Sequence, residues 1–336
     1  MSKDGKITIK DIAEMAGVSK TTVSFYLNGK KDKMSIETCA KIQQIIEETN
    51  YRPNIAARTL NQKRSGLIGV IIGDITNTFS NKIVKGIEGT AREHGYQILV
   101  GNSGYDVKEE SSYVERMLTL GVDGFIIQPS ASFQELSERL RRLRKPYVYF
   151  DSKLYEEDHV FVKTDNYEAT ENAVEELVKR GYRHFAMIGA DPKLLSTRIE
   201  RSKGFTDAVE KAGYTVENFE IRDGEISSDA VLSFVKSQIT DDAPLLVYVP
   251  NCWALPSVYE ALQPIRDMIP KKVGIIGFDN TEWASFASPR VTTIVQPAFM
   301  EGDKAARLLI DQIEETNQEP IHQTLRCSVH WSESTL

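Results

Sequence analysis

From Leu67 onward the sequence alternates short apolar runs with amphipathic stretches, and this alternation constrains the fold more than any other feature. Leu67–Ile72 is the first apolar run, Ile83–His94 has the spacing of a helix, and Tyr96–Val100 is the next run. The succession continues as far as the run Val273–Gly277. Buried parallel strands read as continuous apolar runs, and the helices between them cover both faces of the sheet. The pattern therefore predicts a core of parallel α/β sheets.

The length of the chain requires more than one hydrophobic core, because 336 residues exceed an ordinary single unit. We expect a core at residues 65–336, divided into two lobes. The predicted lobes are residues 65–163 plus 293–321, and residues 164–292 plus 322–336. Late strands are expected at Val291–Val295 and Thr324–Val329, with the helix Gly302–Glu314 between them.

Ahead of the core, residues 1–50 carry two short helical patterns that meet at Gly17. Thr8, with Asp11 three residues later, is typical of a helix N-terminus, and Ser19 can cap the second helix. The arrangement predicts a helix-turn-helix, whose second helix can enter a DNA major groove. An ordinary helical hairpin in a small bundle is the alternative that this pattern alone leaves open.

The distribution of charge favours the DNA-binding alternative. The whole chain has a net charge of −7, yet residues 1–64 hold 12 Lys and Arg against 7 Asp and Glu. The first segment is therefore basic, with a balance of +5, and the remainder is acidic, with a balance of −12. A basic unit on an acidic body concentrates the attraction for nucleic acid in that unit.

Residues 51–64 connect the helix-turn-helix segment, residues 1–50, to the core. Pro53 disfavours helix at Arg52, and Asn54 can cap a short helix that reaches Leu60. A helix of fewer than about 12 residues is unstable in isolation. The segment is therefore either a plain linker or a hinge that becomes ordered on DNA.

An acid or an amide follows nearly every apolar run of the core. These residues are Asp74, Asn102, Gln128, Asp151, Asp191, Asn251 and Asp279. Ligands of doubly wound sheets bind at the carboxyl ends of the strands, and carboxylates and amides suit hydroxyl-rich ligands. Phe79 and Trp253 lie close to two of these ends and can stack on sugar faces. Each Asp alone could be a turn or helix cap, so the recurrence carries the prediction.

The sequence argues against an enzyme. The five histidines and three cysteines have no metal-ligand spacing, and the chain contains no P-loop and no nucleophile elbow. We therefore expect no catalytic residues, no metal and no cofactor. No apolar run approaches the ~18 residues that span a bilayer, and no signal peptide is visible. A cytoplasmic protein without a membrane partner is expected.

Several motifs in order resemble those of the LacI/GalR family of transcription regulators over nearly the full length of the chain. They are Thr8–Ala13, Ala16–Ser19, Thr22–Ser24, Tyr51–Asn54, Ala57–Leu60, Gly69–Ile71, Asp74–Asn77, Gly86–Ile87, Gly121–Gly124 and Gly277–Asp279. The resemblance implies an all-α helix-turn-helix domain with a hinge helix, followed by a two-lobed core like that of periplasmic binding proteins. It also implies a homodimer or higher oligomer on near-palindromic double-stranded operator DNA, with a small carbohydrate effector.

The resemblance also implies roles for residues of the DNA-binding segment. Lys20, Thr21 and Phe25 match base-reading positions, and Ser24 lies on the same exposed face. Many family members carry Arg in place of Phe25. Phe cannot make the bidentate contact that Arg makes with guanine, so Phe25 is expected to contact a thymine methyl group instead. The residues expected at the DNA backbone are Lys10, Ser19, Thr22, Asn28 and Tyr51. Asn54 and Leu60 belong to the hinge, where Leu60 is expected to act as a minor-groove wedge.

In the core, the residues expected to bind the effector are Asp74, Asn77, Phe79, Ser80, Gln128, Asp151, Arg198, Arg201, Asn251, Trp253 and Asp279. The family's usual Asn-Asp pair appears here as Pro250-Asn251, which replaces a carboxylate by an amide. That change, with Arg198, Arg201 and Lys153, favours an acidic or phosphorylated sugar. The carboxylates Asp74, Asp151 and Asp279 favour a neutral polyol instead.

The implied mechanism is a shift between open and closed arrangements of the lobes, transmitted to the hinge. Induction and corepression would use the same parts, so the sign of the response stays open. Two other functions remain as alternatives. One is a regulator controlled mainly by a phosphocarrier-protein corepressor, and the other is a sugar-modifying enzyme with a DNA-binding appendage.

Overall fold

The computed structural model describes residues 7–27, 29–51, 64–152, 159–222, 225–316 and 322–336. The chain divides into two compact units, residues 1–65 and residues 66–336. Among the described residues, no helix has the length and apolar character needed to cross a membrane. The predicted hinge residues Asn54 and Leu60, and also Asn28 and Lys153, lie outside the described residues.

The first unit is helical. It contains α1 (Ile9–Ala16), α2 (Lys20–Leu27), a short 3-10 turn and α3 (Ile36–Thr49). Its small core is made of aliphatic side chains from the three α-helices: Ile12, Ala13, Ala16, Val23, Ile42 and Ile45. The predicted capping box of Thr8 and Asp11 is present at the start of α1. Gly17 has a φ of 67°, a left-handed conformation that suits glycine at the tight turn between α1 and α2.

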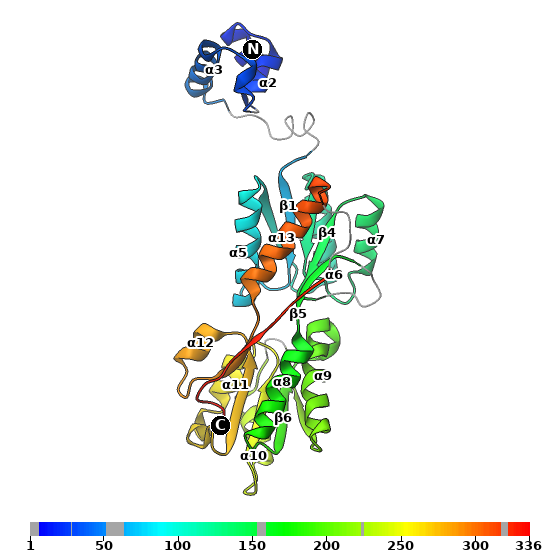
Figure 1. Cartoon of the computed structure of the whole chain (residues 1–336), viewed down its shortest axis with the longest axis vertical. Helices are drawn as coiled ribbons and strands as arrows, with labels where there is room; N and C mark the ends of the chain where they lie inside the picture. Colours follow the sequence, from blue (N-terminus) through cyan, green and yellow to red (C-terminus); the bar gives the residue numbers. More distant parts are fainter. Residues whose placement is uncertain (1–6, 28, 52–63, 153–158, 223–224, 317–321) are drawn as a thin grey trace. The chain divides into compact units, whose positions relative to one another are not determined.

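The first lobe of the core is built on a sheet of order β11-β5-β4-β3-β1-β2. Its strands are β1 (Leu67–Ile72), β2 (Gln97–Asn102), β3 (Gly124–Ile127), β4 (Tyr147–Phe150), β5 (Phe161–Thr164) and β11 (His322–Leu325). Its helices are α5 (Thr78–Glu93), α6 (Val107–Thr119), α7 (Gln134–Arg142) and α13 (Ala298–Glu314). Buried side chains place α5 and α13 on one face of the sheet, and α6 and α7 on the other (Figure 1). Neighbouring strands run parallel, as predicted.

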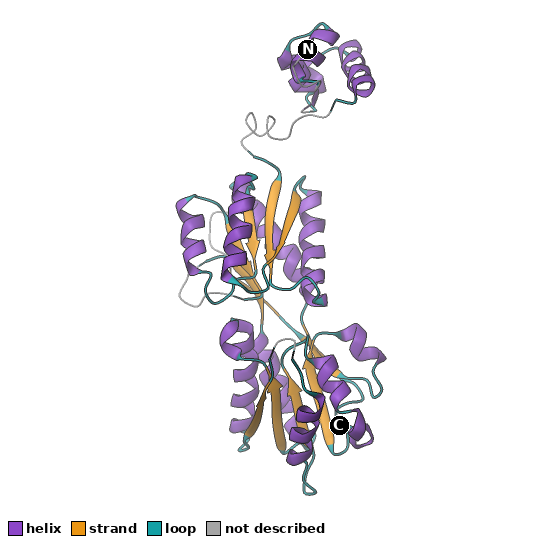
Figure 2. Ribbon diagram, turned by 180° about the vertical axis from the view of Figure 1, so that it is seen from behind, coloured by secondary structure: helices purple, strands orange, loops and turns teal. Residues whose placement is uncertain are grey.

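The second lobe repeats this architecture with the order β12-β10-β9-β8-β6-β7 (Figure 2). Its strands are β6 (His184–Gly189), β7 (Val216–Glu220), β8 (Leu245–Val249), β9 (Val273–Phe278), β10 (Thr292–Val295) and β12 (Ser328–His330). Its helices are α8 (Asn166–Lys179), α9 (Ser196–Lys211), α10 (Ser228–Gln238), α11 (Leu255–Ala261) and α12 (Thr281–Phe286). Helices again cover both faces, α8 and α9 on one side and α10 and α11 on the other. β12 runs antiparallel to β10, at the edge of an otherwise parallel sheet.

The sheets correct the predicted lobe boundaries near the end of the chain. β10 pairs with β9 and so belongs wholly to the second lobe, whereas residues from 293 were assigned to the first. β11 pairs with β5 and belongs to the first lobe, whereas residues from 322 were assigned to the second. The expected strand Thr324–Val329 is two strands, one in each sheet, because the chain passes between the lobes at residues 326–327.

Within the described residues the chain crosses between the lobes three times, and hydrogen bonds tie the crossings together. The crossings follow β5, β10 and β11. The backbone N–H of Cys327 donates to Oδ1 of Asp165 at 2.7 Å, which joins the first crossing to the third. Thr164 Oγ1 donates to Oε1 of Gln296 at 2.8 Å, which joins the first to the second. The region between the lobes is therefore a linked set of strands.

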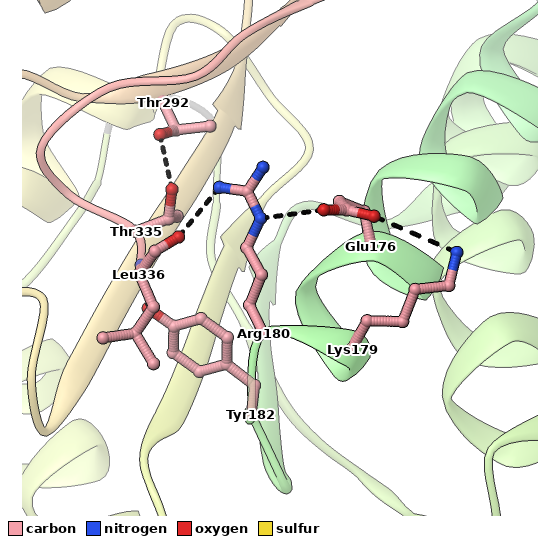
Figure 3. Close-up of polar contacts among 7 residues, drawn as sticks. All are labelled: Glu176, Lys179, Arg180, Tyr182, Thr292, Thr335 and Leu336. Carbon is pink, nitrogen blue, oxygen red and sulfur yellow. Dashed lines mark hydrogen bonds and ion pairs between the residues drawn. The ribbon is translucent and has the colours of Figure 1, made fainter.

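The last residues of the chain are packed into the second lobe (Figure 3). Arg180, at the end of α8, bonds Glu176 through Nε at 3.1 Å and the backbone oxygen of Leu336 through Nη1 at 2.8 Å. The hydroxyl of Thr335 lies 2.8 Å from that of Thr292 on β10, and the N–H of Leu336 donates to the Tyr182 hydroxyl at 3.1 Å. These contacts fix the segment that follows β12 against the sheet.

Candidate functional site

The first candidate site is the outer surface of α1 and α2. The hydroxyl of Ser19 accepts the N–H of Thr22 at 3.1 Å and lies 2.9 Å from the Thr22 hydroxyl, so Ser19 caps α2 as predicted. The backbone N–H of Thr8 donates to Oδ2 of Asp11 at 2.8 Å. Hydrogen bonds from Thr8 also hold the pKa of Asp11 below its usual value. Both helices therefore begin at defined, capped residues.

The predicted DNA-contacting residues of this unit are mostly accessible. Lys10, Ser19, Lys20 and Thr21 are exposed, and Thr22, Ser24, Phe25 and Tyr51 are half-buried. Tyr51 packs against the helical core, which anchors the last described residue before the hinge. Exposed polar side chains at the start of a second helix are what a major-groove reader requires. The arrangement is compatible with DNA reading by α2, and the contacts themselves stay a prediction.

The second candidate site is a cavity of about 420 Å³ in the core. It is lined at the carboxyl ends of strands from both sheets by Gly73, Asp74, Asn77, Phe79, Asn102, Gly104, Tyr105, Gln128, Asp151, Leu195, Thr197, Arg198, Arg201, Asn251, Cys252, Trp253 and Gln296. Its volume falls in the range of ~300–1,000 Å³ typical of small-molecule sites. The location is the one expected for doubly wound sheets.

Nine of the eleven residues predicted to bind the effector line this cavity. Ser80 and Asp279 are the two that do not. Ser80 is buried on α5, next in sequence to the lining residue Phe79. Asp279 is also buried, and it accepts two hydrogen bonds from Gln296, one from the backbone N–H at 2.9 Å and one from Nε2 at 2.6 Å. Asp279 therefore orients a lining side chain.

Arg201 is the central cation of the cavity. Its Nε donates to Oδ1 of Asn166 at 2.7 Å, and its Nη1 donates to the carbonyl oxygen of Pro250 at 3.1 Å. The guanidinium carbon lies 3.9 Å from the centroid of the Phe278 ring. Burial opposes its charge, but nearby Asp151 and Asp279 raise the pKa of Arg201 above its usual value. The side chain is thus a buried, charged and fixed group.

Asp151 is the carboxylate held most firmly at the cavity wall. It follows β4 with a φ of 60°, a left-handed conformation that is uncommon for a residue with a side chain. Its Oδ2 accepts a hydrogen bond from Nε2 of Gln128 at 2.6 Å, and its backbone N–H donates to Oε1 of Glu301 at 2.7 Å. Burial raises the pKa of Asp151, and Arg201 opposes that shift. Glu301 lies on α13 and is fully buried.

Asn251, the predicted substitution of an amide for a carboxylate, faces the cavity from the end of β8. Its Oδ1 accepts the backbone N–H of Ala190 at 2.9 Å. The amide oxygen is therefore used to fix the loop after β6. The Nδ2 group remains as the donor that a neighbouring ligand oxygen could use.

Polar contacts join the two lobes beside the cavity. Nδ2 of Asn77, from the first lobe, lies 3.2 Å from Sγ of Cys252, from the second. Nζ of Lys163 on β5 lies 2.5 Å from Oε1 of Glu200 on α9, and both side chains are largely shielded from solvent. Burial raises the pKa of the Cys252 thiol to about 11, so the thiol is protonated at neutral pH. Any change in the angle between the lobes must alter these contacts.

Sequence patterns missed several residues of the site. Gln296 lines the cavity and is bonded to both Thr164 and Asp279, so it links the crossings to the ligand space. Tyr105 lines the cavity, and burial raises the pKa of its hydroxyl well above the usual value. Glu301 lies behind Asp151. Gln296 directly follows the apolar run that forms β10, so the rule that located Asn251 could have found it; no comparable signal marks Tyr105 or Glu301.

Comparisons with known proteins match both parts of the chain. Residues 8–54 match the family described as bacterial regulatory proteins of the lacI family, and residues 174–335 match the periplasmic binding protein-like domain. The HTH-type transcriptional regulator KdgR of Bacillus subtilis is 32% identical over 92% of this chain and 92% of its own.

Two solved structures are also similar. The lac repressor dimer bound to operator and the anti-inducer ONPF has a TM-score of 0.85 and 23% identity, covering 98% of this chain and 99% of that one. A regulator from Enterococcus faecium with bound ribose has a TM-score of 0.69 and 25% identity, covering 80% of this chain and 98% of that one.

Proposed function

Because this chain belongs to the LacI family of bacterial regulatory proteins, we propose that it represses carbohydrate-utilisation genes and that a sugar-like effector in the core cavity sets its affinity for operator DNA. The observation that carries the proposal is the cavity itself. It combines acids, amides, two arginines and the aromatic rings of Phe79 and Trp253 at the carboxyl ends of strands from both lobes. Carboxylates and amides bind hydroxyl groups, and aromatic rings stack on sugar faces.

On the DNA side, we propose that α2 reads the major groove and that a homodimer binds a near-palindromic operator, because a two-fold dimer presents two such helices. The exposure of Lys20 and Thr21 supports this role. Lys10, Ser19 and Thr22 are assigned to the DNA backbone, with Asn28 and Tyr51. Asn54 and Leu60 are assigned to the hinge, where Leu60 acts as the wedge in the minor groove.

Phe25→Ala tests the assignment of α2. Phe25 is half-buried, and it is not among the side chains that pack on the helical core. We expect the variant to lose about 1–3 kcal/mol of discrimination at particular base pairs, the usual cost of one mismatched pair. Its affinity for random DNA should stay unchanged. The measurement is a fluorescence titration with operators selected from randomised DNA and with scrambled duplexes.

Lys10→Ala is the matched control for that experiment, because Lys10 is assigned to phosphate. The variant should bind all sequences more weakly by about the same factor. The slope of the logarithm of the binding constant against the logarithm of the salt concentration should fall by about one. If Phe25→Ala also weakens all sequences equally, Phe25 only supports the helix and does not read bases.

For the effector, we propose an acidic sugar, recognised by Arg198 and Arg201 together. Both arginines line the cavity, and Nη1 of Arg198 donates to the carbonyl oxygen of Asp191 at 3.4 Å. Arginine is well suited to carboxylates and phosphates because its planar fork presents parallel donors. The amide Asn251 adds no negative charge to this wall. Asp74 and Asp151 are the acceptors for sugar hydroxyl groups.

A thermal-shift screen tests the effector class. The panel consists of D-glucose, D-ribose, D-gluconate, D-glucuronate and glucose 6-phosphate. A sugar at 100 times its Kd stabilises the folded core by about 2.7 kcal/mol, so the unfolding midpoint rises. We expect an acidic member to raise it more than D-glucose, and Arg198→Ala to remove that preference. A preference for D-glucose or D-ribose would reject the acidic class while retaining the sugar site.

The response itself is proposed to be a population shift. A sugar that contacts both walls of the cavity favours one angle between the lobes over the other. The contacts of Gln296 with Thr164 and Asp279 transmit that angle to the crossings between the sheets. The chain acts in this proposal as a regulator, and no catalytic step is assigned to it.

A further inference from the structure

Glu301 is a buried acid for which the effector cavity gives no direct use. It lies near the start of α13, is 0% exposed, and does not line the cavity. Its Oε1 accepts the backbone N–H of Asp151 at 2.7 Å. The same N–H also donates to the carbonyl oxygen of Val162 at 3.1 Å, and the two bonds together hold the residue whose left-handed backbone turns a carboxylate toward the ligand space. Glu301 therefore positions Asp151 without reaching the ligand itself.

In the part of the chain that the structure describes, each of the two carboxyl groups has one oxygen that accepts a hydrogen bond and one that does not. Oδ2 of Asp151 accepts the hydrogen bond from Gln128. Among the described residues, Oδ1 of Asp151 and Oε2 of Glu301 are both buried and have no hydrogen-bond partner. A buried oxygen without a partner costs about 1–3 kcal/mol, and more when it is charged. A proton on Glu301 would remove the charge from one of the two carboxyl groups, so only the other would keep a charged oxygen without a partner.

The charges around Glu301 also favour a proton. The ionisable groups that face it from the packed elements are Asp151 after β4, Asp279 after β9 and Arg201 on α9. When Asp151, Asp279 and Arg201 are all ionised, their summed charge is already −1 without Glu301. Two buried carboxylates in one site do not both ionise readily, because each raises the pKa of the other. Burial and Asp151 raise the pKa of Glu301 well above its usual value.

We propose that Glu301 keeps its proton at neutral pH, so that Asp151 is the single ionised carboxylate of the pair and the one that faces the cavity. The proposal rests on the proposed function in so far as the cavity takes a sugar. Glu301 then acts as a positioning residue that also sets the charge of the pocket. With Glu301 neutral, the charges of Asp151 and Asp279 equal those of Arg198 and Arg201, and Glu301 adds no further negative charge that would repel an anionic sugar.

The test compares wild type with Glu301→Gln, using full-length protein without any ligand. Gln keeps the acceptor for the Asp151 N–H and places a permanent donor where the protonated oxygen would be. An infrared difference spectrum at pH 7 should show the carbonyl band of a protonated carboxylic acid in wild type that is missing from the variant. If both proteins are folded at pH 7 and the difference spectrum shows no band of a protonated carboxylic acid, the proposal is wrong.

The pH dependence of stability gives an independent readout. A raised pKa means that the folded state binds a proton which the unfolded chain, with a Glu pKa of about 4.3, has released. The stability of the wild type relative to Glu301→Gln should therefore fall as the pH rises above ~4.3. The unfolding equilibrium constant of the wild type should increase about tenfold per pH unit relative to that of the variant, until the pH reaches the pKa of Glu301 in the folded state. Parallel curves for the two proteins would contradict the assignment.

Controls separate this role from a structural one. Asp303→Asn changes an acid on the same helix whose pKa is held below its usual value by Arg307 and Thr90, against the effect of burial. Its stability difference should be flat from pH 6 to 8. If Glu301→Gln does not fold, Asp151→Asn serves instead, because removal of its charge should move the infrared titration of Glu301 to lower pH. A sugar screen without any binder would reject the proposed function and leave the proton assignment intact.

Discussion

Replacing Arg201 with Ala is expected to lower the free energy of unfolding of the core by about 3–5 kcal/mol, the usual cost of removing one partner from a buried charged group. The loss follows from the position of Arg201 among buried acids. Asp151 and Asp279 both interact with its charge, and neither is more than 7% exposed. Without the guanidinium these acids must bind protons or remain uncompensated. Urea denaturation followed by circular dichroism measures the change.

The same variant should lose its response to sugars while it retains operator binding, because Arg201 lines the cavity and the helices of the first unit fold around a core of their own. Operator affinity is measured at 15 °C with and without the sugar found in the screen, after circular dichroism has checked that the variant is folded at that temperature. A normal dose response would remove Arg201 from the effector site.

Arg92→Ala is the matched control for stability. Arg92 pairs with Glu88 one turn away on α5, and its side chain is 73% exposed. An exposed pair at this spacing contributes about 0.3–0.5 kcal/mol. The control should therefore change the unfolding midpoint very little. An equal loss in Arg92→Ala and Arg201→Ala would show that burial of the charge is not the cause of the large effect.

Much of the candidate cavity could be predicted from the sequence because one rule located it. Polar residues that follow buried parallel strands meet at one edge of each sheet, whatever the details of the helices. Asp74, Gln128, Asp151 and Asn251 each follow such a strand, and all four line the cavity. The rule requires only that the strands be recognised, and continuous apolar runs are the clearest signal in the chain.

Glu301 and Tyr105 could not be predicted in this way. Glu301 falls in the first turn of α13, where an acid is typical of an exposed helix start. Its burial depends on the packing of α13 against the end of β4, which is a long-range contact. Tyr105 reaches the cavity because Gly73 leaves room for its ring. A Cβ at Gly73 would lie 2.1 Å from the nearest ring atom.

The lobe boundaries were mispredicted for a related reason. The pattern of apolar runs shows that a strand exists but not which sheet it joins. β10 and β11 are both short, and only their partners β9 and β5 assign them to a lobe. The hydrogen bonds of Asp165 with Cys327 and of Thr164 with Gln296 stabilise this arrangement of crossing strands. Such pairings between distant segments leave no periodic signal in the sequence.

Gly302→Ala is expected to destabilise the first lobe by about 1–3 kcal/mol, the usual cost of overpacking a close contact. A Cβ at Gly302 would lie 2.1 Å from the carbonyl oxygen of Ile83, and one at Gly86 would lie 2.2 Å from the carbonyl oxygen of Phe299. These are backbone atoms, so α5 and α13 must move apart. Because Glu301 precedes Gly302, the shift should also displace Asp151 and weaken sugar binding.

Gly89→Ala is the control that isolates this packing effect. Gly89 lies on the same helix, α5, and a Cβ there would meet no atom within 4 Å. Ala in place of Gly in a helix interior stabilises by up to about 1 kcal/mol. The two Gly-to-Ala changes should therefore move the denaturation midpoint in opposite directions. If both stabilise, α5 and α13 do not approach as closely as the structure shows, and the backbone contact cannot be what holds Glu301 against Asp151.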